Sequence, residues 1–262
     1  MTAAGTLYFT PHGGDKIGLF DGTRWKIYSF TEISLALTLT SGNNYDVWLY
    51  DNAGTLTLET LIWTNNTTRA TALVLQNGVY CKTGALTRRY LGTIRSSAAN
   101  VTEDSAAKRF VWNYYNRVKF RNFRRDTTDS WTNAGNGTWS AMNSGNAAWK
   151  HEFVRGFSED AVIAALEVSS RNTSGSYPSS AVAIDSTTAI DSTLTAMSVN
   201  GGTVVITTEC QFVAYPTIGY HYIQGVQTTS DSPSATWYGD NGGFVGGGQV
   251  AINSGFITEG MK

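Results

Sequence analysis

The sequence predicts an all-β protein, with a short-stranded, β-rich N-terminal region followed by an antiparallel β-sandwich of jelly-roll-like type. Three observations lead to this fold class. Charged residues make up only 15% of the 262 residues, against roughly 25% in an ordinary soluble domain. Aromatic residues reach 12% and glycines number 27, a mixture that favours strands and tight turns. Apolar and polar residues also alternate in short runs between turn dipeptides, as they do in half-buried strands.

Hairpin signals recur in the first part of the chain. Asp21-Gly22 separates two apolar runs, and Asn77-Gly78 lies within LVLQNGVYCK. Each dipeptide predicts a tight turn between antiparallel strands. In YDVWLYDNAGTLTLE, apolar residues on alternate positions predict two strands. One face of these strands would meet a core and the other would meet solvent or a partner.

Three further segments complete the N-terminal region. LTRRYLGTIRSS reads as another strand. Residues 64–73, TNNTTRATAL, have room for one helical turn. The small, polar residues 97–108 predict a surface loop.

The most basic stretch is KRFVWNYYNRVKFRNFRRD, residues 108–126. Its aromatic residues alternate as in a strand, although a helix would also group some of them on one face. Aromatic faces and cations together are what a single-stranded nucleic-acid site requires. The near-neutral net charge of −1 favours another interpretation, in which arginine forks bind carboxylates at a domain or subunit interface. The candidate interface residues are Arg117, Arg121, Arg124, Arg125 and Asp126.

A change in composition near Asp126 predicts a domain boundary. Beyond it charge falls, and glycine, asparagine and serine become frequent. We therefore divide the chain into an N-terminal β region, residues 1–125, and a β-sandwich, residues 126–262. Strand-like runs separated by polar loops resume at HEFVRGF and continue to GYHYIQGVQTT, which suits a sandwich. DAVIAALEV is short and flanked by strands, so we expect a buried strand there.

The loops of the second region combine aromatic residues with amides and carboxylates. Such loops can bind sugars, because aromatic faces stack on sugar rings and polar side chains bond hydroxyls. The alternative is that the same rings pack the loops against the sandwich, as most tryptophans are largely buried. The candidate glycan or partner contacts are Trp131, Trp139, Trp149, Trp237, Tyr238 and Asp240.

The sequence contains no recognisable catalytic or metal motif. Its three histidines lack metal-ligand spacing, and the glycine-rich segment at residues 239–248 lacks the lysine of a phosphate loop. Glycoside hydrolysis needs two carboxylates, and the sequence contains several pairs of them. A polysaccharide depolymerase is therefore an alternative function. The pairs are Asp126 with Asp129, Asp185 with Asp191, Glu159 with Asp160, and Asp231 with Asp240. We expect no enzyme activity, no cofactor and no metal, and two buried thiols at Cys81 and Cys210.

Membrane insertion is not expected, because no apolar run approaches the roughly 18–20 residues that cross a bilayer. The N-terminal MTAAGTLYFTPHGG lacks the basic start and apolar core of a secretory signal. We therefore expect synthesis in a cytoplasm.

Several phrases together resemble virion structural proteins of tailed bacteriophages. They are YDVWLYDNAGTLTLE, TRRYLGTIRSS, KRFVWNYYNR, DTTDSW and GYHYIQ…TWYGDNGG. The resemblance implies a non-enzymatic component of the particle, either a head fibre or decoration protein or a tail fibre or adhesin. It also implies homo-oligomers, with trimers favoured, that assemble with other virion proteins in the host cytoplasm. On this reading residues 1–125 anchor the protein and residues 126–262 face outward toward host surface glycans. The alternatives are the depolymerase and a nucleic-acid-binding protein that uses residues 108–125.

Overall fold

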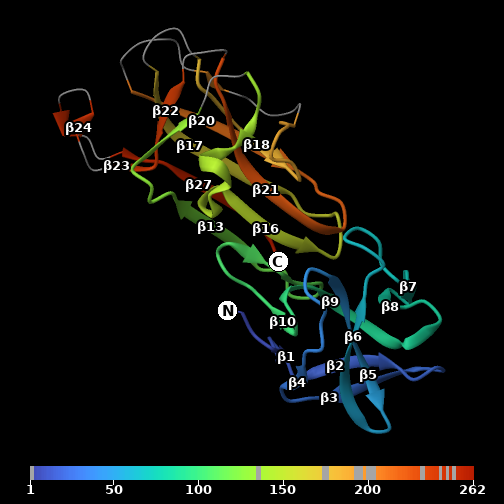
Figure 1. Cartoon of the computed structure of the whole chain (residues 1–262). Helices are drawn as coiled ribbons and strands as arrows, with labels where there is room; N and C mark the ends of the chain where they lie inside the picture. The colour runs from blue at the N-terminus through green and yellow to red at the C-terminus, as the bar shows by residue number, and fades with distance from the viewer. Residues whose placement is uncertain are drawn as a thin grey trace.

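The computed structural model describes residues 3–133, 137–172, 177–191, 197–198, 205–230, 234–241, 244–245, 248–249 and 252–262. The regular structure of these residues consists of strands joined by turns and loops, with two short 3₁₀ turns, η1 (Met142–Gly145) and η2 (Ala147–Trp149). The predicted all-β class is confirmed. Two β bodies lie end to end, the N-terminal one at the lower right of Figure 1 and the second at the upper left.

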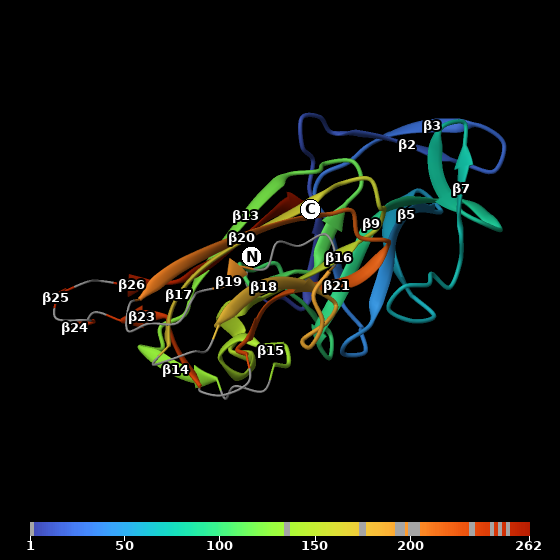
Figure 2. The same ribbon diagram turned by 90° about the horizontal axis from the view of Figure 1, so that it is seen from above.

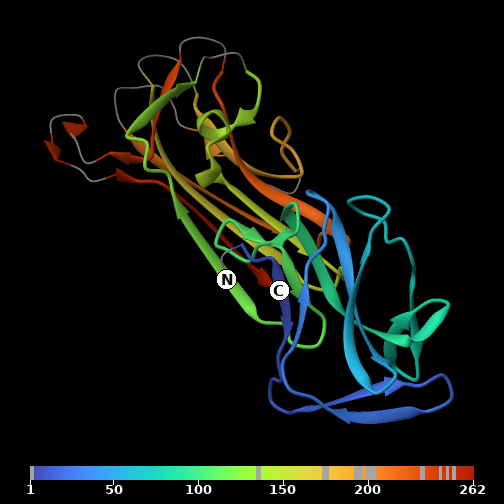
Figure 3. The same cartoon turned by 60° about the horizontal axis from the view of Figure 1, so that its bottom comes forward.

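The N-terminal body is a bent sheet covered on one face by two hairpin-like pairs. Its sheet has the order β6-β5-β9-β8-β7, with β10 and β12 also pairing with β9. The antiparallel pairs β1–β4 and β2–β3 form the covering layer. The β2–β3 pair runs crosswise at the bottom of the N-terminal body in Figure 3. The strands are β1 (Thr6–Phe9), β2 (Lys16–Phe20), β3 (Trp25–Ser29), β4 (Ile33–Ala36), β5 (Asn44–Asn52), β6 (Thr55–Ile62), β7 (Leu73–Gln76), β8 (Val79–Lys82), β9 (Ala85–Ala98), β10 (Val101–Thr102) and β12 (Val111–Asn113).

The turn dipeptides act as expected. Asp21-Gly22 lies between β2 and β3, and Asn77-Gly78 joins β7 to β8. Asn77 and Gly78 have φ values of 53° and 84°, the left-handed conformation that a type I′ turn requires at both positions. The helical turn expected within residues 64–73 is wrong, because bends lead directly into β7. The loop expected at residues 97–108 contains β10, whose pairing with β9 buries Thr102.

The alternation along β5 is confirmed, but both of its faces are buried. Val47 and Leu49 belong to the core beneath the covering layer. Trp48 lies on the opposite face with Tyr90 and Trp112, where Val154 of the second body packs against them. The sequence pattern predicts that this face of β5 meets solvent or a partner, but in the structure it packs against the second body of the same chain.

The second body is a sandwich of two sheets, visible as two layers in Figure 2. One sheet has the order β11-β16-β21-β18-β19, with β15 also pairing with β21. The other has the order β13-β27-β17-β22-β14, with β20 also pairing with β17. Successive strands from β16 to β22 cross repeatedly between the sheets, which is a jelly-roll-like arrangement. The strands are β11 (Lys108–Arg109), β13 (Lys119–Arg125), β14 (Ser130–Asn133), β15 (Ser140–Ala141), β16 (Lys150–Arg155), β17 (Val162–Asn172), β18 (Ser179–Ile184), β19 (Met197–Ser198), β20 (Ile206–Ala214), β21 (Gly219–Thr228), β22 (Ala235–Tyr238) and β27 (Gly255–Met261). Two further pairs of short strands are β23 (Asp240–Asn241) with β26 (Ile252–Asn253) and β24 (Phe244–Val245) with β25 (Gly248–Gln249).

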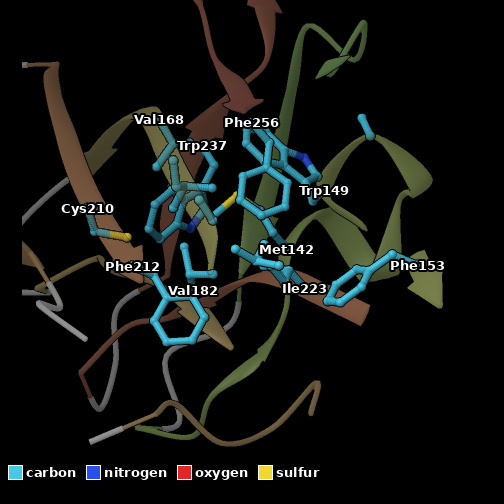
Figure 4. Packing of buried hydrophobic residues seen from close by; sticks show 14 residues of the cluster. Met142, Trp149, Phe153, Val168, Val182, Cys210, Phe212, Ile223, Trp237 and Phe256 are labelled. Carbon is cyan, nitrogen blue, oxygen red and sulfur yellow. The ribbon is translucent and has the colours of Figure 1, made fainter. Parts of the chain in front are cut away.

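Side chains from both sheets fill the interior of the sandwich (Figure 4). Trp149 and Trp237 are fully buried there, together with Met142 and Phe256. The segment expected as a buried strand is β17, whose residues Val162, Ala164, Leu166 and Val168 all face this core. Cys210 also lies in the core and Cys81 is buried in the N-terminal body, so neither thiol is accessible.

The chain passes between the two bodies earlier than the expected boundary at Asp126. β12 pairs with β9 of the first body, whereas β13 pairs with β27 of the second. The short β11, which precedes β12, already pairs with β16. The basic stretch therefore crosses the junction, and residues 119–125 belong to the sandwich.

A buried polar network fixes the junction. Arg69 donates to both carboxylate oxygens of Asp46, at 2.9 and 3.2 Å, and to the carbonyl of Gly156 at 2.7 Å. Asp46 also accepts from the hydroxyl of Thr93, and Arg69 lies against the ring of Tyr90. Because Asp46 is on β5 and Gly156 follows β16, one guanidinium group ties the two bodies together.

Within the described residues, no helix is long and apolar enough to cross a membrane. The same residues contain no group of three or more His, Cys, Asp or Glu side chains able to hold a metal ion.

Candidate functional site

The outer face of the sheet β13-β27-β17-β20 carries exposed apolar side chains. Alternate residues point into the sandwich, so the remaining ones form this outer sheet face. Phe123 is 60% exposed, Ile163 44%, Val213 54% and the nearby Tyr215 68%. The outer sheet face comprises Lys119, Arg121, Phe123 and Arg125 of β13, Ile257 and Glu259 of β27, Ile163, Ala165 and Glu167 of β17, and Glu209, Gln211 and Val213 of β20. Exposed apolar side chains gathered on one sheet are typical of interaction surfaces.

Strand register separates the charges on the outer sheet face. In one row, Arg125 of β13 is followed by Gly255, then Glu167, and finally Glu209 of β20. In the next row, Phe123 leads through Ile257 and Ala165 to Gln211. The β13 edge is therefore basic, and the β20 edge carries one carboxylate, Glu209. Between the two edges, apolar side chains alternate with Glu167 and Glu259.

The five predicted interface residues occupy four different environments. Arg121 pairs with Glu259 at 3.2 Å and Arg125 pairs with Asp240 at 2.8 Å, and both pairs are exposed. Exposed ion pairs contribute about 0–1 kcal/mol, so these arginines remain available for a partner. Arg124 donates to the carbonyl of Lys150 within the sandwich.

Arg117 is the predicted interface residue that lies at the junction of the two bodies. Its guanidinium group contacts Glu159 at 2.6 Å and Asp160 at 3.1 Å. The same group lies 5.2 and 5.3 Å from the ring centroids of Trp112 and Tyr114. An arginine that links β12 to the loop after β16 stabilises the contact between the bodies.

Asp126 differs from its prediction as an interface residue, because it is only 1% exposed. Its carboxylate accepts hydrogen bonds from Trp149 Nε1 at 2.6 Å and from the amides of Asn143 and Asn146 at 2.7 and 3.1 Å. It also accepts from the backbone N–H of Thr128. Asp126 therefore organises the turns η1 and η2 instead of meeting a partner.

The six predicted glycan contacts do not form one surface. Trp149 and Trp237 are fully buried, so their rings cannot stack on a sugar in this structure, and Tyr238 is only 7% exposed. Trp131 is half-buried and donates through Nε1 to Gln227 at 2.7 Å. Trp139 packs against a small buried cluster, and Asp240 is paired with Arg125. Trp149 and Trp237 therefore pack in the core instead of contacting a ligand, because η2 and the alternation of β22 direct their rings inward.

The basic residues 108–125 are mostly paired with carboxylates that lie outside this stretch of the sequence. Five of the seven have such a partner. The pairs are Lys108 with Glu103, Arg109 with Asp104, Arg117 with Glu159 and Asp160, Arg121 with Glu259, and Arg125 with Asp240. These carboxylates neutralise most of the basic charge of a stretch that contains no acidic residue of its own.

Most of the described carboxylates considered for glycoside hydrolysis contact other groups. Asp185 contacts Nδ1 of His221 at 2.7 Å, while Nε2 of the same ring contacts the carbonyl of Thr217. Glu159 and Asp160 share Arg117, and Asp126 is held as described above. Asp231 lies outside the described residues.

His151 of β16 is a buried titratable group. It is 1% exposed, its Nδ1 lies 2.9 Å from the hydroxyl of Thr258, and its ring meets Phe256 edge-on. Burial, followed by the charges of Arg124 and Arg109, lowers the pKa of His151 from 6.5 to about 3. The folded protein therefore keeps this imidazole neutral in mild acid.

Acid is expected to destabilise the protein through His151. Below pH 6.5 the unfolded chain protonates this residue and the folded chain does not, so the free energy of unfolding falls as pH falls. Between pH 6.5 and pH 5 the loss is about 2 kcal/mol. Urea denaturation at both pH values measures it, with His151→Gln as the variant and His12→Gln as the control. If the free energy of unfolding of His151→Gln falls as much as that of wild type between the two pH values, His151 is not the group responsible.

Comparisons with known proteins found little. No family model matches the chain, and no curated protein matches it. The structure of infectious bursal disease virus Gx strain is 11% identical with a TM-score of 0.29, covering 99% of this chain and 77% of that chain. The corresponding Gt strain structure is 12% identical with a TM-score of 0.30, covering 98% and 74%. The crystal structure of the infectious bursal disease virus VP2 subviral particle is 13% identical with a TM-score of 0.32, covering 99% and 78%. TM-scores this low carry no conclusion about this chain.

Proposed function

We propose that the chain is a structural protein of a virus particle that associates with other copies of itself through the outer sheet face. In the finer form of the proposal it is a head fibre or decoration protein, or a tail fibre component, of a tailed bacteriophage. The sequence phrases quoted above support the phage assignment. The observation that carries self-association is the outer sheet face, where exposed apolar side chains lie between the arginines of β13 and Glu209 of β20.

Charge complementarity favours a second copy as the occupant of this face. A two-fold axis parallel to the strands would place β13 of one copy over β20 of the other. Arg125 would then face Glu209 of the partner twice, once on each side of the axis, and Phe123 would face Gln211 of the partner. Such an isologous contact pairs two copies, so we propose a dimer for this contact in place of the trimer favoured by the resemblance.

A non-enzymatic role is part of the proposal. Among the carboxylates considered for hydrolysis, Glu159 contacts Arg117, Asp185 contacts His221, and Asp126 accepts from a side-chain amide. Likewise, the cations of residues 108–125 are mostly paired, which weakens the nucleic-acid alternative. Release of reducing ends from host capsule by the purified protein would favour the depolymerase instead.

The virion role includes contact with other virion proteins and with host surface glycans. Assembly would take place in the host cytoplasm, and the finished protein would reside in the virion. Trp131 and Trp139 remain partly exposed among the predicted glycan contacts of the second body.

Sedimentation velocity of the intact chain tests the self-association. We expect wild type to sediment as a dimer and Arg125→Glu or Glu209→Arg to sediment as monomers, because each variant places like charges opposite each other. Lys26→Glu, on β3 of the N-terminal body, is the control and should leave the dimer intact. Wild-type mass in both variants, at unchanged melting temperature, would refute the interface.

Immunogold labelling of purified particles tests the virion assignment separately, and unlabelled particles would count against it.

A further inference from the structure

A cavity of about 530 Å³ lies between the covering layer and β9 of the N-terminal body. β1, β2 and the segment between them form one wall, and the end of β12 with the residues after it forms the other. Its volume falls within the roughly 300–1,000 Å³ typical of ligand sites. The lining residues that matter here are Tyr8, Phe9, Lys16, Arg89, Asn116 and Tyr115.

The cavity carries positive charge without a lining carboxylate. Among the residues that the structure describes, Lys16 and Arg89 both line it, and no Asp or Glu does. Lys16 bonds the hydroxyl of Ser29 at 3.0 Å and has only a distant, exposed contact with Asp15 at 4.0 Å. A bound anion would therefore meet cations that the protein itself leaves largely uncompensated.

Arg89 is held in place by neutral groups. It donates to the carbonyl of Gly18 at 2.8 Å, and its guanidinium group lies 4.4 Å from the ring centroid of Tyr115. Within the described part of the chain it forms no ion pair, whereas its neighbour Arg88 pairs with Glu59. Its Nε is also buried without a hydrogen-bond partner. Fixed guanidinium groups of this kind bind carboxylates with defined geometry.

Aromatic rings flank the charged groups. Phe9 stacks on Phe30 with centroids 4.9 Å apart. Tyr8 and Tyr115 are 51% and 44% exposed. Exposed ring faces bind the apolar face of a sugar, and amides such as Asn116 can bond its hydroxyls. An inorganic anion would make no use of these rings, and a neutral sugar would make no use of Lys16 and Arg89.

We propose that this cavity binds a carboxylate-bearing sugar unit of an acidic glycan, with Arg89 and Lys16 on the carboxylate and Tyr115 or Tyr8 against the ring. The inference deepens the glycan-contact part of the proposed function and moves it to the N-terminal body. It does not depend on the outer sheet face, which lies on the other body, so the failure of either proposal leaves the other intact.

Titration of the isotopically labelled intact chain, followed by NMR, tests the site. Glucuronic acid is the probe, with glucose, acetate and inorganic phosphate as comparisons. We expect saturable shifts at cavity residues with glucuronic acid and binding at least about tenfold weaker with each of the other three. Equal responses to glucose would remove the role of the cations. Equal responses to acetate or phosphate would leave a simple anion site, and either result, or no response to glucuronic acid, overturns the proposal.

Two variants locate the site. Arg89→Gln and Lys16→Gln should each weaken glucuronic acid binding by about tenfold. Lys16 has a side chain that is 65% exposed, so its variant remains informative if Arg89→Gln fails to fold. Lys26→Gln on β3, whose lysine pairs with Asp21 instead, is the matched control and should bind as wild type does. Undiminished binding in Lys16→Gln would contradict the proposal.

Discussion

Replacing Arg69 with methionine is expected to lower the free energy of unfolding by about 3–5 kcal/mol, because it leaves a buried carboxylate without its partner. The side chains of Arg69 and Asp46 are only 9% and 2% exposed. Burial raises the pKa of Asp46 even with Arg69 beside it, so the charged form would be costly alone. Chemical denaturation at neutral pH measures the loss.

Two further variants separate the buried charge from general damage. Arg88→Met removes an arginine on the same strand as Tyr90 whose partner Glu59 is partly exposed, at 3.6 Å, and should cost about 1 kcal/mol or less. Asp46→Asn combined with Arg69→Met removes both charges and should recover part of the loss. If Arg69→Met alone has the same free energy of unfolding as Arg88→Met, the network does not hold the junction.

Replacing Gly156 with alanine is expected to disturb the same junction by steric conflict. A Cβ atom there would lie 2.3 Å from the hydroxyl oxygen of Tyr90 and 2.5 Å from ring carbons of Trp112. Both rings are buried, at 0% and 1% exposure, so neither can move aside without repacking. Overpacking of this kind costs about 1–3 kcal/mol.

Thermal unfolding of Gly156→Ala, with Gly14→Ala as the control, measures this effect. A Cβ at Gly14 meets nothing within 4 Å, so the control should melt as wild type does. If the two variants have equal melting temperatures, the two bodies are not packed at Gly156 as described.

Local patterns in the sequence predict the strands well, because each depends on neighbouring residues. The Asn77-Gly78 turn joins β7 to β8, and DAVIAALEV forms the central strand β17. The junction could not be predicted in this way. Trp48 and Asp46 alternate with core residues and so suggest an exposed face, yet Val154 and Arg69 cover that face from distant parts of the chain.

The candidate site shows the same division. Alternation along KRFVWNYYNRVKFRNFRRD predicts exposed arginines, and Arg121 and Arg125 are indeed partly exposed on β13. Nothing in the sequence places Glu209 at the opposite edge of the same sheet, because that requires the register of β17 with both β20 and β27. Trp149 and Trp237 are predicted contacts that lie in the core, since a glycine-rich and asparagine-rich neighbourhood does not reveal which way a ring points.

Mixing two charge-reversed chains tests the proposed assembly most directly. Arg125→Glu and Glu209→Arg each place like charges across the two-fold axis when paired with themselves. Paired with each other, they restore two opposite-charge contacts. We predict that sedimentation velocity detects monomers in each separate solution and a mixed dimer when the two are combined. If both remain monomeric in the mixture, or if neither is monomeric alone, copies of this chain do not meet through the outer sheet face.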